Sequence, residues 1–263
     1  MGKAASFRRR LAEGKPLIGT FLKSPTPHAT EILGDIGFDF VVVDAEHAPF
    51  DRGDIDVIAL AGRAADVAVL VRVQKADSSE ILSALDCGAV GVLVPHITDA
   101  GTAKAVVAAA FYENGSRGFS NSPRAGGYGR LDFREHIAAA DKQVAVLAMI
   151  EDPQALENLD QILAVEGLSG IFIGRGDLSA HLGAASPDMP EIRDIVSRIA
   201  VAARARGIPM LAHVGAISAP DAQWLREQGV TAFVVSSDQG LMRQAALANL
   251  ANLVKADSCN GPA

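Results

Sequence analysis

Residues 38–49 read FDFVVVDAEHAP, and the division of this stretch into two halves decides the fold class. Residues 39–43 form a short β-branched run without regular polar alternation, as in strands buried on both faces of a parallel sheet. The following residues, Asp44 to His47, are acidic or polar. Seven further apolar runs of this kind occur at residues 17–22, 67–73, 90–94, 144–150, 170–173, 208–212 and 231–235. The sequence therefore predicts eight buried parallel strands.

The segments between these runs have the apolar spacing of amphipathic helices. They cover residues 27–36, 55–65, 79–87, 99–110, 153–163, 192–206 and 221–228, and a final helix is expected at 241–255. Eight strand-helix units in 263 residues have the order and size of one (β/α)8 TIM barrel. We therefore expect an α/β fold with a single domain over residues 1–263 and a polar helix before residue 16.

Composition excludes several classes of protein. A hydrophobic fraction of 49% supports a large core and argues against a disordered or collagen-like chain. With 24 basic and 31 acidic residues, a net charge of −7 and no basic stripe, the chain is poorly suited to nucleic acid or an anionic membrane. Its expected partners are small molecules or its own copies. Cys87 and Cys259 are far apart in sequence, so we expect a reducing compartment without disulfides.

The amino-terminal residues, MGKAAS, match the N-myristoylation pattern, but we interpret them as part of the first helix. No apolar run approaches the length of about 18 to 20 residues that a membrane span requires. No signal-peptide core follows the basic residues 8–10. These observations predict a cytoplasmic protein.

Two irregularities interrupt the regular spacing. About 50 residues separate Val94 from Val144, and this insertion contains the Gly-rich and Arg-rich segment 117–129. Long insertions in a compact domain are usually binding loops or lids, so we expect this one to be functional. The alternative is a solvated loop without a function. Residues 184–190, with two prolines, indicate an extended connector that could carry the later helices onto a neighbouring subunit.

Polar side chains follow six of the expected strands. They are found at Asp44–His47, Arg72, Pro95–His96, Glu151–Asp152, Gly174–Asp177 and His213. The opposite strand ends carry ordinary turn residues such as Gly37 and Gly88. Catalytic groups of TIM barrels lie at the carboxyl ends of the strands, and buried charges are costly unless they are paired or bound to metal. The asymmetry therefore predicts an active site at this end.

Glu151 and Asp177 end two consecutive strands, which would bring two carboxylates close together. Mutual repulsion would raise the pKa of one of them unless a cation lies between them. Oxygen ligands favour Mg²⁺, Mn²⁺ or Co²⁺ over a structural zinc site. The alternative is that each carboxylate is paired with an arginine.

His47 is the preferred general base because it shares a turn with Asp44 and Glu46. Arg72, at the end of the adjacent strand, is suited to stabilising an oxyanion, and a simple ion pair with Asp44 is the alternative role. The other histidines are weaker candidates. His96 and His213 lie at strand ends, but we expect neither to have a comparable acid cluster.

Together these motifs are similar to those of a known family. Residues 38–49, Val71–Val73, Leu93–Pro95, Ile150–Glu151 and the segment from Phe172 to Ser179 resemble, in order and spacing, the HpcH/HpaI aldolases. These are metal-dependent class II pyruvate aldolases, such as the 4-hydroxy-2-oxoheptanedioate and 2-dehydro-3-deoxyglucarate aldolases. The resemblance covers residues 7–255 and implies reversible cleavage of 4-hydroxy-2-oxoacids to pyruvate or a related 2-oxoacid plus an aldehyde, through a metal-stabilised enolate.

The resemblance also implies roles for individual residues. Glu151 and Asp177 match the metal ligands, and Arg72 matches the arginine that stabilises the enolate. His47 matches the base that acts through a metal-bound water, Asp86 matches the carboxylate paired with that histidine, and Asp44 accompanies them. Backbone N–H groups at Gly176 and Asp177 would hold the substrate carboxylate. The family forms hexamers, as trimers of dimers with exchanged C-terminal helices, so that Arg124 could reach a neighbour's site.

The chain departs from the family pattern at two positions. Met149 replaces a common Gln, and Arg175 lies where the family commonly has Pro. Met149 cannot donate a hydrogen bond, and Arg175 adds a cation near the metal, which suggests tolerance of hydroxypyruvate as the donor.

Three alternatives to a class II aldolase remain open. A Schiff-base aldolase would need a lysine at a strand end, where Lys23 lies. A citrate-lyase-like enzyme would act on a coenzyme A thioester, although the chain shows no obvious nucleotide cradle. A non-catalytic barrel would serve as a binding module.

Overall fold

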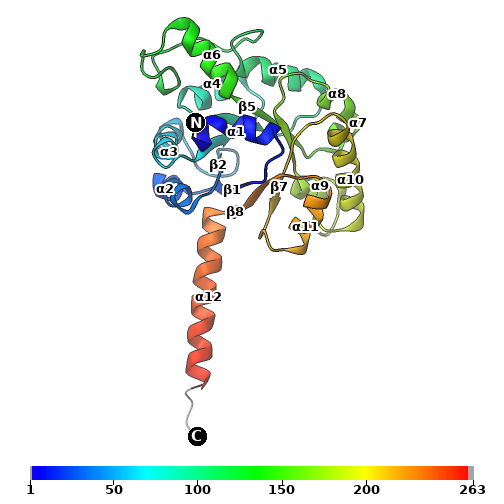
Figure 1. The fold of residues 1–263 in the computed structure, drawn as a ribbon. Helices are drawn as coiled ribbons and strands as arrows, with labels where there is room; N and C mark the ends of the chain where they lie inside the picture. Colours follow the sequence, from blue (N-terminus) through cyan, green and yellow to red (C-terminus); the bar gives the residue numbers. More distant parts are fainter. Residues whose placement is uncertain (1, 260–263) are drawn as a thin grey trace.

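The computed structural model describes residues 2–259, which form a closed barrel of eight parallel strands (Figure 1). Each strand pairs with the next along the chain, and the last pairs with the first. The strands are β1 (Leu17–Leu22), β2 (Phe40–Asp44), β3 (Ala68–Arg72), β4 (Gly91–Val94), β5 (Ala145–Ile150), β6 (Gly170–Ile173), β7 (Met210–Val214) and β8 (Ala232–Ser237). The expected (β/α)8 barrel is confirmed, with strand ends shifted by no more than two residues.

Helices surround the barrel, as Figure 1 shows. They are α1 (Lys3–Ala12), α2 (Pro27–Ile36), α3 (Arg52–Ala64), α4 (Ser78–Asp86), α5 (Ala100–Ala110), α6 (Phe133–Gln143), α7 (Pro153–Glu157), α8 (Leu159–Leu163), α9 (Arg175–Leu182), α10 (Pro190–Ala205), α11 (Pro220–Glu227) and α12 (Asp238–Cys259). The single helix expected at 153–163 is divided at Asn158, and α6 and α9 are additional to those expected.

Two apolar clusters hold the barrel together. Inward-facing strand residues fill the barrel interior, and outward-facing residues pack against the helices. Phe7 and Leu11 of α1 join the interior cluster, and the rings of Phe7 and Phe40 lie 5.3 Å apart. Because α1 closes the amino-terminal end of the barrel in this way, a substrate has access to the interior only from the carboxyl ends of the strands.

The insertion between β4 and β5 contains regular secondary structure in addition to loop residues. It contains a short 3-10 turn at Arg124–Gly126 and the helix α6, which begins with a capping box formed by Asp132 and Glu135. Helix α6 packs against α1, so this part of the insertion lies toward the closed end of the barrel. The expected connector at 184–190 lies between α9 and α10.

Helix α12 projects away from the barrel, as Figure 1 shows. Its first residue, Asp238, accepts hydrogen bonds from the backbone N–H groups of Lys23 and Ser24, at 2.8 and 3.1 Å. Apolar side chains along the helix are exposed, among them Met242, Leu247, Leu250 and Leu253. No helix among residues 2–259 is both long and apolar enough to cross a lipid bilayer.

Two expectations reach beyond the described parts of the chain. The N-myristoylation pattern includes Met1, and the single domain was expected to reach residue 263, whereas Met1 and residues 260–263 lie outside the described residues. The side chain of Cys259 is also outside the described part of the structure, whereas Cys87 is described and is a buried free thiol.

Candidate active site

A cavity of about 500 Å³ opens at the carboxyl ends of the strands. Its lining comes from β1, β3, β5, β6, β7 and β8 and the segments that follow them. The lining residues are Phe21, Lys23, Arg72, Met149, Phe172, Ile173, Gly174, Arg175, Gly176, Asp177, Pro187, His213, Ser236 and Ser237. Three of the six strand-end motifs therefore line one space, namely Arg72, Gly174–Asp177 and His213.

Asp44 anchors the basic side of this cavity. Its carboxylate is fully buried and lies 2.7 Å from Nη2 of Arg72 and 2.9 Å from Nζ of Lys23. Burial alone would raise the pKa of Asp44, but the hydrogen bond and charge of Arg72, followed by Lys23 and the N–H of His47, lower it below its ordinary value. Asp44 is therefore a charged anchor that fixes two cations.

Arg72 has one further carboxylate partner and one aromatic partner. Its Nε lies 3.3 Å from Oε2 of Glu46, and its guanidinium lies 4.7 Å from the centroid of the Phe21 ring. The guanidinium is thus held in a fixed orientation at the cavity wall. Lys23 is ion-paired with Asp44 and does not occupy the apolar pocket that would activate a Schiff-base lysine.

His47 lies at the rim of the site. Its backbone N–H donates to Oδ1 of Asp44 at 3.1 Å, and its Nε2 lies 3.6 Å from Oε2 of Glu46. The side chain is 55% exposed, so the ring can exchange protons with solvent. The expected grouping of His47 with Asp44, Glu46 and Arg72 is present.

Glu151 lies on the opposite side, at the end of β5. The residue is 1% exposed, and its Oε1 accepts a hydrogen bond from the backbone N–H of His96 at 2.9 Å. Burial, together with the nearby charge of Asp177, raises the pKa of Glu151 to about 7 against the opposing effect of the His96 N–H. Among residues 2–259 no arginine or lysine pairs with Glu151, so the alternative of an arginine partner is wrong for this carboxylate.

The donor set at Glu151 fits a hard divalent cation. Its Oε2 has no hydrogen-bond partner among the described residues, and Asp177 supplies a second carboxylate at the cavity wall. Position 174 must be glycine here, because a Cβ at that position would lie 2.6 Å from Oε2 of Glu151. A buried carboxylate without a cationic partner is costly, and a bound cation would remove that cost.

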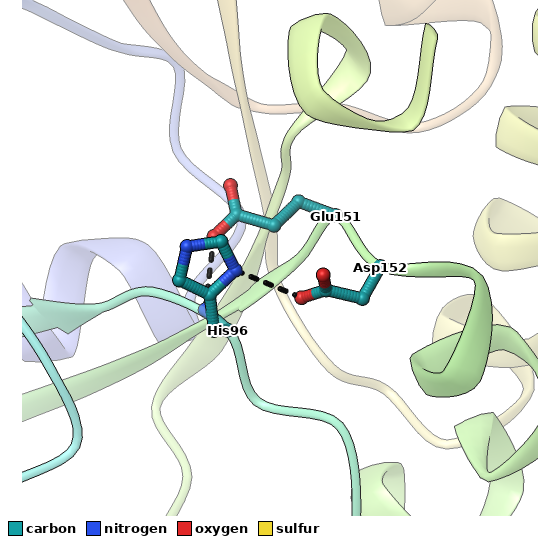
Figure 2. A group of neighbouring side chains, drawn as sticks. All are labelled: His96, Glu151 and Asp152. Atoms are coloured by element: carbon teal, nitrogen blue, oxygen red, sulfur yellow. Dashed lines mark hydrogen bonds and ion pairs between the residues drawn. The ribbon is translucent and has the colours of Figure 1, made fainter. Parts of the chain in front are cut away.

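His96 contacts acids that the sequence did not place beside it. Its Nδ1 lies 3.0 Å from Oδ2 of Asp152 (Figure 2). Its Nε2 lies 3.6 Å from Oε1 of Glu46. The interpretation that His96 lacks an acid cluster is therefore wrong, since the acids come from the ends of β2 and β5. Asp152 also lies 3.7 Å from Nδ1 of His181.

The first turn of α9 faces the cavity with Gly176 and Asp177. Backbone N–H groups in the first turn of a helix lack intrahelical partners, and a Cβ at Gly176 would meet no atom within 4 Å. A substrate carboxylate can therefore approach this backbone closely.

Arg175 does not extend toward Glu151. It forms two 2.7 Å hydrogen bonds with Asp221 and donates to the carbonyl of His213 at 2.9 Å. Its charge is therefore compensated by α11, and the expectation of an additional free cation beside the metal ligands needs this correction. Met149 is buried in the barrel interior and gives the cavity an apolar floor.

Arg72, Gly176 and Asp177 line the cavity, and Asp44, His47 and Glu151 lie beside lining residues or their partners, whereas Asp86 and Arg124 lie apart from this group. Asp86 lies at the end of α4 and pairs with Arg117 at 3.1 Å, and no hydrogen bond or ion pair joins it to His47 within residues 2–259. Arg124 donates to Asp56 at 2.7 Å and to the carbonyl of Cys87 at 3.0 Å. Neither lines the cavity.

The chain is similar in sequence to known proteins. The profile of the HpcH/HpaI aldolase/citrate lyase family matches residues 17–245. The 5-keto-4-deoxy-D-glucarate aldolase of Citrobacter koseri is 37% identical over 247 residues, which cover 91% of this chain and 92% of that protein. The hydroxypyruvate/pyruvate aldolase of Roseobacter denitrificans is 36% identical over 210 residues, covering 77% of this chain and 81% of that protein.

A solved structure has the same fold. It is that of an HpcH/HpaI aldolase/citrate lyase family protein from Burkholderia cenocepacia, with a TM-score of 0.89 and 28% identity. The superposition covers 95% of this chain and 99% of that one. The chain therefore belongs to the HpcH/HpaI aldolase/citrate lyase family.

Proposed function

We propose that the protein is a divalent-metal-dependent, class II aldolase. It would reversibly cleave 4-hydroxy-2-oxoacids to pyruvate or hydroxypyruvate plus an aldehyde. The observation that carries this proposal is an uncompensated buried carboxylate at Glu151, next to the cavity-lining Gly174, together with a fixed guanidinium at Arg72 in the wall of the same cavity. The names of the aldolase relatives support the same reaction class.

Glu151 and Asp177 would hold the ion, which we propose is Mg²⁺, Mn²⁺ or Co²⁺. When bound, such an ion polarises the 2-oxo group and makes the adjacent carbon easier to deprotonate. Arg72 would stabilise negative charge on the same oxygen, because its donors are fixed by Asp44 and Glu46 before the substrate arrives. The backbone at Gly176 and Asp177 would hold the substrate carboxylate.

We assign the proton transfer to His47. Its partial exposure supports exchange with solvent, and Glu46 at 3.6 Å would stabilise the imidazolium that forms. Exchange of the methyl protons of pyruvate for deuterium, followed by proton NMR, isolates this step because it needs no aldehyde. We expect exchange in the wild type and strongly reduced exchange in His47→Gln. Unchanged exchange in His47→Gln would remove His47 from the role of base.

Hydroxypyruvate remains a proposed donor. The apolar Met149 floor and the hydroxyl groups of Ser236 and Ser237 give the cavity a mixed lining. We expect kcat/KM for hydroxypyruvate addition to equal or exceed that for pyruvate under matched conditions. A clear preference for pyruvate would contradict this expectation.

We further propose that the active form is a hexamer, a trimer of dimers, in the cytoplasm. The projecting α12 with exposed Leu247, Leu250 and Leu253 supports an exchange of this helix between subunits. Asp86 and Arg124, which are outside their own cavity, would then act at a neighbour's site. Sedimentation of wild type and Leu250→Glu tests this: we expect a hexamer that the substitution dissociates, and a monomeric wild type would refute the assembly.

A further inference from the structure

His96 stands among carboxylates at the end of β4 and has no part in the mechanism above. The ligand atoms of His96, Glu151 and Asp152 all lie within 4.8 Å of one another, which is close enough to share one ion (Figure 2). We propose that His96 is a nitrogen ligand of the divalent ion held at Glu151. The inference rests on the proposed metal-dependent function and specifies which ion the site prefers.

The backbone of His96 is in an uncommon conformation that serves this contact. Its φ is +54°, in the left-handed region that non-glycine residues rarely adopt. In this conformation its N–H donates to Oε1 of Glu151 at 2.9 Å, while its Nδ1 lies 3.7 Å from the same oxygen. The main chain and the ring of His96 are therefore both directed at the buried carboxylate.

Asp152 orients the ring. This residue occupies the N-cap position of α7, where an aspartate usually accepts hydrogen bonds from the first turn of the helix. Its side chain makes no such cap and instead approaches Nδ1 of His96 at 3.0 Å. Nδ1 of His96 therefore lies between the carboxylates of Asp152 and Glu151, where one ion could contact all three side chains.

The nitrogen that would bind the ion is therefore Nδ1, which lies 3.7 Å from Oε1 of Glu151. Nε2 faces Glu46 instead, whose Oε1 lies 3.6 Å away, and would carry the proton of the ring. Imidazole suits Co²⁺ and Zn²⁺, whereas Mg²⁺ prefers a shell of oxygen ligands. A site with a histidine ligand should therefore favour Co²⁺ over Mg²⁺ more strongly than a site made of carboxylates alone.

The test compares His96→Asn with wild type and with the control His181→Asn. Asparagine tolerates positive φ and can place an N–H toward Asp152, but it has no imidazole nitrogen to bind the ion. His181 approaches the same Asp152, and no contact joins its side chain to the carboxylate of Glu151 among the described residues. His96→Gln, which lacks the ring nitrogen, is measured alongside as a second variant.

Full-length, metal-stripped proteins are titrated with CoCl₂ and with MgCl₂ by calorimetry at one pH. The Co²⁺-loaded proteins are also examined by proton NMR for a paramagnetically shifted, exchangeable imidazole N–H signal. We expect His96→Asn and His96→Gln to bind Co²⁺ about ten-fold or more weakly and to lose the signal. Their Mg²⁺ affinity should change little, and His181→Asn should behave as wild type.

Equal Co²⁺ affinity and an intact N–H signal in both His96 variants would overturn the inference and leave the proposed aldolase standing. A parallel loss of Co²⁺ and Mg²⁺ affinity would also overturn it, because His96 would then act only by positioning Glu151. Failure of the wild type to bind either ion would overturn both this inference and the proposed metal dependence.

Discussion

Replacing Glu151 with glutamine should stabilise the metal-free protein at neutral and alkaline pH. The side chain of Glu151 is buried, and its pKa rises from the ordinary 4.5 to about 7. At about 1.36 kcal/mol for each pH unit, this difference corresponds to about 3 kcal/mol. Glutamine keeps the acceptor for the His96 N–H but cannot ionise.

The direction of the pH dependence follows from the raised pKa. The folded state binds the Glu151 proton more tightly than the unfolded state, so the contribution of Glu151 to stability is fully present below about pH 4.5 and is lost as the pH rises through about 7. Above that pH the wild type should be about 3 kcal/mol less stable than Glu151→Gln, whereas the two should converge in acid.

Urea unfolding of metal-stripped protein at a series of pH values measures this difference. Glu157→Gln, an exposed position on α7, is the control and should follow the wild type. Adding Co²⁺ or Mg²⁺ should raise the stability of the wild type and leave Glu151→Gln unchanged. Equal stability of wild type and Glu151→Gln at pH 8.5, or a difference that grows in acid, would refute the reasoning.

Three further experiments test charged side chains at this end of the barrel. Arg72→Lys should lower the rate by about 10²- to 10³-fold, since an ammonium group cannot reproduce the fixed pair of guanidinium donors. Proton–deuterium exchange of pyruvate measures this by NMR, and near-normal exchange would contradict the role of Arg72 in stabilising the enolate. Asp44→Asn should destabilise the protein by about 3–5 kcal/mol in urea unfolding, because a buried guanidinium loses its partner, and a loss below about 1 kcal/mol would contradict this. A double-mutant cycle of Arg175→Ala and Asp221→Ala should give a coupling energy of about 0.5–3 kcal/mol, and additivity would refute the ion pair.

The barrel could be predicted because its signal is local. Each strand is a short apolar run, and residues 170–173 and 27–36 have the same bounds in the sequence reading and in the structure. Helix α6 was missed although the sequence carries a signal for its start, the capping pair Asp132 and Glu135. The alanine-rich and charged residues that follow this pair were not recognised as a helix, because the glycine-rich segment before them led us to interpret the insertion as a loop.

The site could be predicted in part for a topological reason. Parallel strands bring their carboxyl ends to one face, so Arg72, Glu151 and Asp177 had to lie near one another. Ion pairs and hydrogen bonds between side chains of different strand-helix units cannot be predicted in this way. The pair of Arg175 and Asp221 joins residues 46 positions apart, and His96 meets Asp152 across 56. Local sequence could not show which charge neutralises which, so Arg175 was expected to be free and His96 to lack acids.

The most direct test of the central claim is the rate of pyruvate release from a 4-hydroxy-2-oxoacid before chelation, after chelation, and after Mg²⁺, Mn²⁺ or Co²⁺ is restored. Wild type and Glu151→Gln are compared at equal concentration. We expect wild-type turnover that disappears with the chelator and returns with the ion, and no turnover in Glu151→Gln under any condition. Turnover that survives chelation, or that persists in Glu151→Gln, would contradict a metal-dependent aldolase centred on Glu151.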